Sequence, residues 1–251
     1  MNESILQPLN ELNLSDDHRA ICIHVIAHVG VLLRYIQRGI PSFTDHGDMH
    51  SGRVLHYLRD LANECPTPLS SEDLMLLALS AVLHDIGCIA GRAGHSSRSA
   101  RILSVSHFSG IRDMLTQESY RYLKQIIVAH SSEYDLLLLS NDGRNRSRLA
   151  LLCCLFRLAD GCDISSDRIP PLVLSVLERL KILDSGAKRI WRSHLSIEKV
   201  EVRGTSIVVR ARSKRAARLW TKKLEAELDL INSVLSGYNL PCFSMVVEEV
   251  P

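Results

Sequence analysis

The most apolar run of the chain ends on two ionisable residues, and this feature constrains the fold more than any other. The run LMLLALSAVL occupies positions 74–83, and His84 and Asp85 follow it directly. Burying an imidazole or a carboxylate without a partner is costly. A fold that buries this run must therefore bring partners for His84 and Asp85 from other parts of the chain.

Helical signals dominate the sequence from Ser15 to about Pro170. Ser15 and the two aspartates after it indicate the N-cap and first turn of a helix that ends near Gly39. A second helix is expected from near His46 to the prolines that follow residue 65.

A capping box marks the start of the apolar helix. Ser70 is followed three residues later by Asp73, and we expect the helix to stop at Gly87. Shorter helices are expected at about 95–106, 117–131, 147–160 and 171–183, with a polar turn at 142–147.

The pattern changes after Gly186. Residues 194–213 contain two alternating, β-branched runs around Arg203 and Gly204, which predicts a hairpin. An amphipathic helix ending at Gly237 follows, and residues 242–250 are expected to form a last strand. The apolar positions of this amphipathic helix are Leu219, Leu224, Leu228, Ile231 and Leu235. We therefore predict a mainly α protein, with a helical domain over residues 1–185 and a small basic α+β subdomain over residues 186–251.

Composition places few limits on the partners of the chain. The 251 residues carry a formal net charge of +2, and the seven cysteines include no C-x-x-C pair, which favours reduced thiols. The N-terminus lacks the pattern of a secretory signal, and the apolar strings at 21–33 and 74–83 are shorter than the ~20 residues of a membrane span. We expect a cytoplasmic protein without a membrane segment.

One segment has a strong local charge. Between Lys188 and Lys223, twelve basic residues stand against Glu198 and Glu201, an excess of ten. Such a surface can contact the phosphates of nucleic acid or dock on an acidic protein partner, and a solvated basic face is an equal alternative.

Metal-competent side chains interrupt several of the expected helices. His50 shares a helix face with Val54 and Leu58, so it is expected to point toward the core. The other interruptions, at positions where the pattern expects burial, are His84, Asp85, His95, His130 and Asp160. Such residues on different helices can satisfy one another through a shared cation. Asp163 is the rival of Asp160, and we prefer Asp160 because it follows the apolar run directly.

Three strings give the chain a family resemblance. DHGDMHSGRV, AVLHDIG and RLADGCDISSDR, within about residues 43–170, resemble the HD-domain superfamily of metal-dependent phosphohydrolases. The string FTDHGDMHS is similar to the HD-CE-type branch, which is associated with prokaryotic conflict systems. The resemblance implies an HD-type helical bundle in which His50, His84, Asp85 and Asp160 bind a divalent metal.

The same resemblance implies a second metal site. Binuclear members carry extra histidines at places that His95 and His130 match, and Asp85 would then bridge both ions. The sequence departs from the cyclic-di-GMP-cleaving branch, because a GYP-type tripeptide is absent after His130 and Ser131 stands where a second histidine is usual. One ion or two therefore remain as alternatives, as do neutral histidines that only line the pocket.

Other residues are candidates for contacts with substrate. His46 lies one turn before His50, and we assign it to a phosphate or leaving group, with a solvated helix start as the alternative. Arg53 and Arg92 are candidate phosphate clamps, with a surface role as the alternative. The histidines at 24, 28, 56 and 107 are taken as structural.

These residues favour an enzyme. The expected activity is that of a metal-dependent phosphohydrolase or phosphodiesterase, acting on a nucleotide, cyclic nucleotide or short oligonucleotide through a metal-activated hydroxide. Mn, Fe, Mg, Ni and Zn are not distinguished, and oligomerisation is left open. The alternatives are a nucleotide-sensing binding module in a multi-protein conflict or defence system and a single-strand nuclease, which the scarcity of aromatic residues in 188–223 disfavours.

Overall fold

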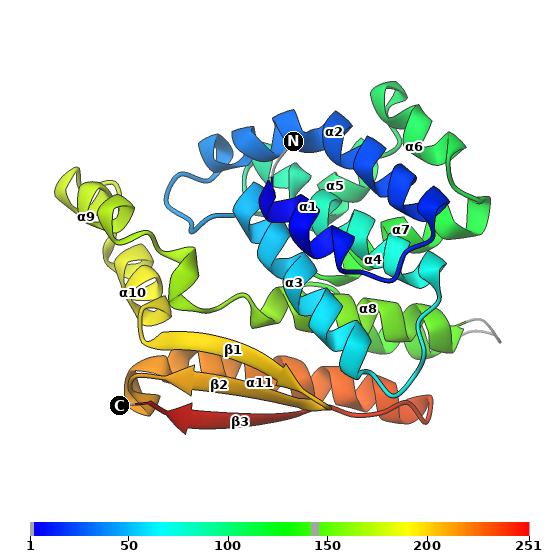
Figure 1. Cartoon of the computed structure of the whole chain (residues 1–251). Helices are drawn as coiled ribbons and strands as arrows, with labels where there is room; N and C mark the ends of the chain where they lie inside the picture. Colours follow the sequence, from blue (N-terminus) through cyan, green and yellow to red (C-terminus); the bar gives the residue numbers. More distant parts are fainter. Residues whose placement is uncertain (1–2, 142–145, 251) are drawn as a thin grey trace.

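The computed structural model describes residues 3–141 and 146–250, and most of the polar turn expected at 142–147 lies outside these residues. The first part of the chain is helical (Figure 1). Its α-helices are α1 Glu3–Asn10, α2 Asp16–Gly39, α3 Asp48–Glu64, α4 Ser71–Leu83, α5 His95–Ile102, α6 Ser109–Asp113, α7 Gln117–Ala129, α8 Arg146–Cys162 and α9 Pro171–Arg179. Short 3-10 helices lie at η1 Ile86–Ala90, η2 Ser106–Phe108, η3 Leu136–Asn141 and η4 Ser166–Arg168.

The last part of the chain contains a small sheet. Its elements are α10 Ser185–His194, β1 Ile197–Arg203, β2 Ser206–Ala211, α11 Lys214–Gly237 and β3 Ser244–Glu249. The predicted hairpin is confirmed, since β1 pairs antiparallel with β2 and Gly204 in the connection has φ +56°. The last strand pairs in parallel with β2, and α11 lies along one face of the sheet (Figure 1). A mainly α fold with a small α+β end is therefore confirmed.

Local capping signals were read correctly. The side chain of Ser15 accepts a hydrogen bond from the backbone N–H of His18, as an N-cap should. Ser70 and Asp73 form the reciprocal hydrogen bonds of a capping box at the start of α4. These caps satisfy backbone N–H groups that a helix start leaves without internal partners.

The end of the apolar helix was predicted wrongly. The α-helix ends at Leu83, and His84 is its C-cap, so His84 and Asp85 form the turn into η1. Gly87 lies inside η1 instead of ending α4. A Cβ atom at Gly87 would lie 2.3 Å from the carbonyl oxygen of His95. The glycine is therefore needed because α5 approaches the backbone closely at this point.

Two further features of the second half of the chain differ from the sequence analysis. Leu219 is 44% exposed and does not belong to the buried face of α11, which includes Leu224, Leu228 and Ile231. Helix α10 was not predicted. It begins at an N-cap, Asp184, which accepts from the backbone N–H of Ala187.

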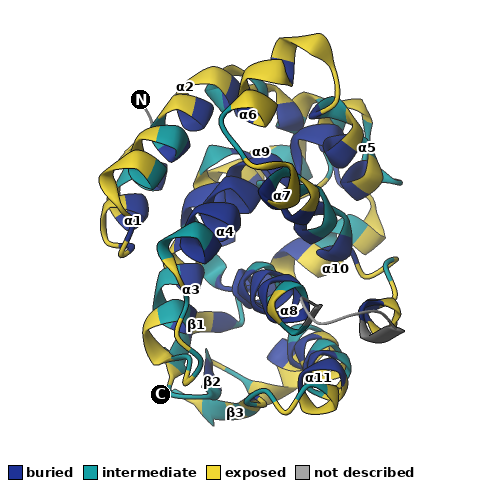
Figure 2. Cartoon of the chain, turned by 90° about the vertical axis from the view of Figure 1, so that its right-hand side faces the viewer, coloured by how far each residue is buried: buried dark blue, intermediate teal, exposed yellow. Residues whose placement is uncertain are grey.

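Two cores organise the described residues. The main core joins the helices of the first part to the sheet and α11, since Leu79 and Phe156 belong to the same cluster as Ile207 and Leu228. A separate cluster of Ile169, Leu174, Leu183 and Trp191 holds α9 and α10 together. These two helices stand at one end of the molecule, and burial is concentrated where α4 and α8 cross its middle (Figures 1 and 2).

Two segments, Asp16–Gly39 and Ser71–Ala90, are long and apolar enough to span a membrane by length and composition. Both are longer than the apolar strings at 21–33 and 74–83, so short length does not exclude a membrane span for either. The second is 89% buried inside the fold, as a core helix should be, and the first is 33% buried.

Candidate metal centre

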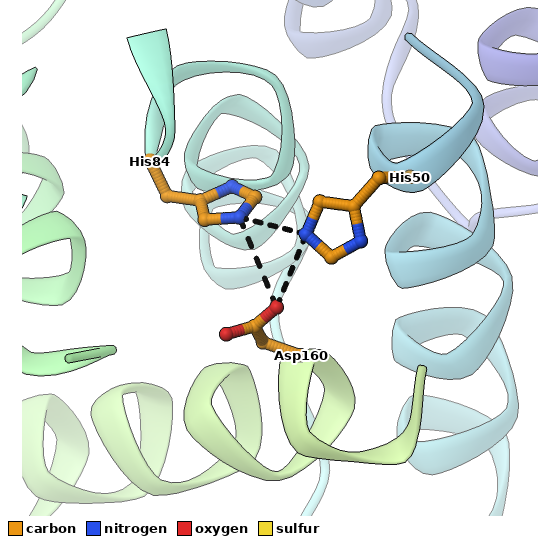
Figure 3. Close-up of side chains that lie close together, drawn as sticks. All are labelled: His50, His84 and Asp160. Atoms are coloured by element: carbon orange, nitrogen blue, oxygen red, sulfur yellow. Dashed lines mark hydrogen bonds and ion pairs between the residues drawn. The ribbon is translucent and has the colours of Figure 1, made fainter. Parts of the chain in front are cut away.

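Six candidate ligands come together from the ends of five helical elements. His50 lies in the first turn of α3, His84 and Asp85 follow α4, and His95 opens α5. His130 caps the end of α7, and Asp160 lies in the last turn of α8. Figure 3 shows His50 of α3, His84 after the end of α4 and Asp160 of α8 pointing toward one another. Helix ends place these polar groups together without interrupting the apolar faces that bury the helices.

One group of donors lies around His50. Its Nε2 atom is 3.1 Å from Nε2 of His84 and 3.2 Å from Oδ1 of Asp160. The distance from Nε2 of His84 to the same Asp160 oxygen is 3.8 Å. The three side chains form one of the groups whose geometry can hold a metal ion.

A second group of donors lies around His95 and His130, whose Nε2 atoms are 2.9 Å apart. Asp85 lies between the groups. Its Oδ1 atom is 3.2 Å from His95 and 3.7 Å from His130, whereas its Oδ2 atom is 3.4 Å from His84 and 3.8 Å from His50. Each carboxylate oxygen thus faces a different donor group, which is the arrangement that a bridging ligand requires.

The hydrogen bonds of the rings test whether these residues fit a cation. Nδ1 of His84, His95 and His130 each contacts a backbone carbonyl oxygen, of Ala81, Arg92 and Ile127 respectively, at 3.1, 2.9 and 2.5 Å. A carbonyl only accepts, so each Nδ1 carries a proton and Nε2 is the ring atom left to bind a metal. Lone pairs that face one another at such short distances repel unless a cation or proton lies between them. The donor set therefore fits a divalent metal.

The two carboxylates are ionised in this setting. Burial by itself would raise the pKa of Asp85, but His84, His130 and His95 hold it well below its usual range. Burial is likewise outweighed at Asp160, whose pKa His50 and His84 lower well below its usual range. Oxygen and imidazole donors in their basic forms are the ligands that metal binding requires.

Asp163 has a role that the sequence did not reveal. Its Oδ2 atom lies 2.6 Å from Nδ1 of His50, on the opposite side of the ring from Asp160. Nε of Arg53 donates to the other oxygen at 2.7 Å, and Nη1 of Arg168 lies 3.4 Å from Oδ2. Asp163 is fully buried, so it fixes the tautomer and direction of His50 from behind.

The donors open into a cavity of about 590 Å³. His46 lines it and is 7% exposed, so the solvated helix start is not what the structure shows. Burial lowers the pKa of His46 well below its ordinary value, and its Nδ1 contacts the carbonyl oxygen of Thr44 at 2.5 Å. The neutral ring therefore carries its lone pair on Nε2.

The two arginine candidates lie in different places. Arg92 lines the cavity, and its Nη1 donates to Oδ1 of Asp85 at 3.1 Å. Arg53 is not among the described residues that line the cavity, because its guanidinium is held by Asp163 and by Asp45. Of the pair, Arg92 has the access that a phosphate contact needs.

Sequence reasoning missed several residues near the donors. Cys88 lies with Asp85 and His95 in a third group that can hold a metal, but burial raises the pKa of its thiol to about 12, which disfavours the thiolate. Far from the ligands in sequence, Trp191, Trp220 and Lys223 also line the cavity. A lone tryptophan on a surface helix carries no sequence signal of such a role.

The histidines at 24, 28, 56 and 107, expected to be structural, lie at exposed positions, with His28 bonded through Nε2 to the carbonyl oxygen of His107.

A family model described as HD-CE matches residues 40–236. A search of curated proteins found no match. The matched range covers most of the chain, including all six candidate ligands and most of α11, and the chain therefore belongs to the HD-CE family.

Proposed function

We propose that the protein is a metal-dependent phosphohydrolase or phosphodiesterase that acts on a nucleotide, cyclic nucleotide or short oligonucleotide. One observation carries the proposal: four imidazoles and two ionised carboxylates converge beside a cavity large enough for a small ligand. The membership in an HD-type family and the resemblance to the HD superfamily support the same reaction class.

The residues have distinct parts in this proposal. His50, His84, Asp85 and Asp160 would hold one divalent ion, and His95 and His130 with Asp85 a second. A bound divalent ion lowers the pKa of water and acts as a Lewis acid toward phosphoryl oxygens. Asp163 keeps the lone pair of His50 directed at the centre.

Two cavity residues would act on the substrate directly. The guanidinium of Arg92 can donate to phosphoryl oxygens, since part of it reaches the cavity while Asp85 fixes its position. Nε2 of the neutral His46 can accept a proton or hydrogen bond at the attacking or leaving oxygen.

The test is hydrolysis by the purified protein. Loaded with Mn²⁺, it should release product from at least one member of a panel of nucleotide monoesters and diesters. Asp85→Ala should abolish this activity, whereas Asp229→Ala, at an exposed position on α11, should retain it. Equal activity in Asp85→Ala and the unchanged protein would refute the proposal, and binding of metal and nucleotide without turnover would identify a sensing module instead.

A further inference from the structure

One wall of the cavity differs in chemistry from the metal centre. It is lined by Ile190 and Trp191 of α10 and by Trp220, Lys223 and Leu224 of α11. Beside the carboxylate of Glu227, this wall presents indole rings, aliphatic side chains and one ammonium group. A ligand that contacts both the metal centre and this wall can combine a phosphate-like group with an apolar, planar part.

The indole of Trp220 is held in a fixed orientation. The ring of His194 stacks on it with a centroid distance of 4.2 Å and 32° between the planes. Nδ1 of His194 contacts the carbonyl oxygen of Ile164 at 2.8 Å, and burial lowers the pKa of His194 to about 3, so the stacked ring is neutral. Trp220 itself is half-buried and lines the cavity. Its orientation is therefore fixed by a second ring, and Nζ of Lys223 also lies over it.

Helix α11, which carries Trp220, is held against α8, the helix that carries Asp160. Nε of Arg157, on α8, donates to Oε2 of Glu227 at 2.6 Å, and Nη1 of Arg157 donates to the carbonyl oxygen of Tyr134 at 2.9 Å. Arg157 is 4% exposed. Because this ion pair is buried, α11 is held as a wall of the cavity and cannot drift away from the donors at little cost.

Apart from Lys223, the exposed basic residues around Trp220 on α11 face away from this wall. Trp220, Lys223, Leu224 and Glu227 line the cavity, so they define one face of the helix. At about 100° per residue, Arg215, Arg218 and Lys222 fall on the opposite face, and all three are exposed. On α11, the cavity therefore does not continue into these three basic residues, which could otherwise guide a nucleic-acid strand.

We infer that the wall of the cavity formed by α10 and α11 is a nucleobase subsite, in which the base of a free nucleotide stacks on Trp220 while its phosphate lies at the metal centre. This inference rests on the proposed function and narrows its substrate to a free nucleotide over a nucleic-acid strand. Lys223, whose Nζ lies 5.2 Å from the centroid of the Trp220 ring, is placed to contact the same ligand. Stacking suits this role because every base has a π face.

Tryptophan fluorescence can measure binding at this subsite. Trp191 and Trp220 are its two tryptophans, and both line the cavity. In the Trp191→Phe variant, titration with adenosine, guanosine, cytidine and uridine 5′-monophosphates should quench the fluorescence of Trp220 to saturation with at least one of them. Ribose 5-phosphate, which has no base, should leave the fluorescence unchanged. Equal responses to ribose 5-phosphate and the nucleotides would overturn the inference.

Affinity measured by calorimetry tests the residue itself. Trp220→Ala should weaken binding of the nucleotide by about tenfold to a hundredfold, the range expected for loss of one stacked base. Trp220→Phe should bind within a few-fold of the unchanged protein, and so should Arg218→Ala on the opposite face of α11. Unchanged affinity in Trp220→Ala, with the fold verified by circular dichroism, would overturn the inference.

A third measurement separates the alternatives. If single-stranded RNA binds more tightly than any mononucleotide, and Arg215→Ala or Lys222→Ala weakens it, the ligand is a nucleic acid and the subsite assignment is wrong. Binding needs no turnover, so base-dependent binding without hydrolysis would refute only the proposed function. Hydrolysis of nucleotides with base-independent binding would refute only the subsite.

Discussion

At the scale of single residues, two aspartates at the end of α8 contact the two ring nitrogens of one histidine. Asp160 faces Nε2 of His50 and Asp163 faces Nδ1 of the same ring. Three residues apart on a helix, they lie on nearly the same face, so spacing alone does not distinguish them. Their different roles follow from Arg53 and Arg168, which hold Asp163 behind the ring.

The first prediction concerns Asp163→Asn. It should lower metal affinity about 10–100-fold, as loss of a residue that orients a metal-binding histidine typically does. Titration with Mn²⁺ followed by elemental analysis measures this. Asp167→Asn, at an exposed position four residues later, should bind metal normally. Unchanged affinity in Asp163→Asn would show that His50 needs no support from behind.

The second prediction concerns the number of ions. His130→Gln should remove one donor of the second group and leave the first group intact, so it should lower the metal content per chain. Asp85→Ala should remove more metal than His130→Gln, because the oxygens of Asp85 face both groups. Elemental analysis of the purified variants compares them, and equal metal content in the two would argue against a bridging Asp85.

Much of this residue-level picture was predictable, because ionisable groups at the end of apolar runs must find partners. His50, His84, Asp85 and Asp160 were selected because they interrupt helices where burial is expected and because the HD-domain resemblance implies them as ligands, and their side chains do meet. The position of Arg53 was not predictable, since whether an arginine faces a cavity or a buried aspartate depends on packing between α3 and the end of α8.

At the scale of elements, Gly87 controls how closely α5 approaches η1. A Cβ atom there would lie 2.3 Å from the carbonyl oxygen of His95 and 2.8 Å from the backbone nitrogen of Ser99. Backbone atoms cannot turn aside as a flexible side chain can. The first turn of α5, which carries His95, must therefore move if residue 87 gains a side chain.

The third prediction follows from this contact. Gly87→Ala should destabilise the protein by about 1–3 kcal/mol, as overpacking does, and lower the metal content by displacing His95. Gly110→Ala is the matched control, because no atom lies within 4 Å of its added Cβ in α6. Urea unfolding and elemental analysis measure both effects. A Gly87→Ala variant as stable as Gly110→Ala would contradict the close approach.

The fourth prediction concerns the contact of α10 with α11 and its dependence on pH. The pKa of His194 is lowered to about 3, chiefly by burial and also by Arg168, whereas an unfolded histidine titrates near about 6.5. Between these values the unfolded chain binds more protons, so stability falls as the pH falls. From pH ~6.5 to ~4.5 the unchanged protein should lose about 2–3 kcal/mol more than His194→Phe.

Urea unfolding at the two pH values measures this difference. His194→Phe keeps an aromatic ring against Trp220 but cannot bind a proton. Parallel losses in the two proteins would show that His194 is not kept neutral by the fold.

Elements were predictable where their signals are local. The capping box at Ser70 needs only neighbouring residues, and the hairpin needs only two short runs and a turn. The parallel pairing of β3 with β2 was not predictable, because α11 separates the strands in sequence and its packing decides the direction. Helix α10 escaped notice because its apolar face packs on α9 as part of a small core apart from the main one.

At the scale of the whole molecule, one core unites the helical part with the sheet. The predicted boundary at residues 185 and 186 remains a prediction about domains, but the main core contains residues from both sides of it. The cavity does so too, since Asp160 and Trp220 both line it. The C-terminal part is therefore built into the candidate site.

The fifth prediction tests this union through the buried pair of Arg157 and Glu227. Arg157→Met should lower stability by about 3–5 kcal/mol because Glu227 is left without its partner. The double variant Arg157→Met with Glu227→Met should recover part of the loss. Urea unfolding of the two single variants and the double variant gives the coupling energy, and a double variant that is no more stable than Arg157→Met would contradict the pairing.

The division of the cavity along the chain has a consequence for synthesis. All six candidate ligands precede residue 161, whereas the wall made by α10 and α11 comes from residues 185–237. A chain emerging from the ribosome thus presents every candidate ligand before the residues of α10 and α11 that line the cavity. The proposed substrate site would be complete only when translation is nearly finished, and a prematurely terminated chain would lack this wall of the cavity.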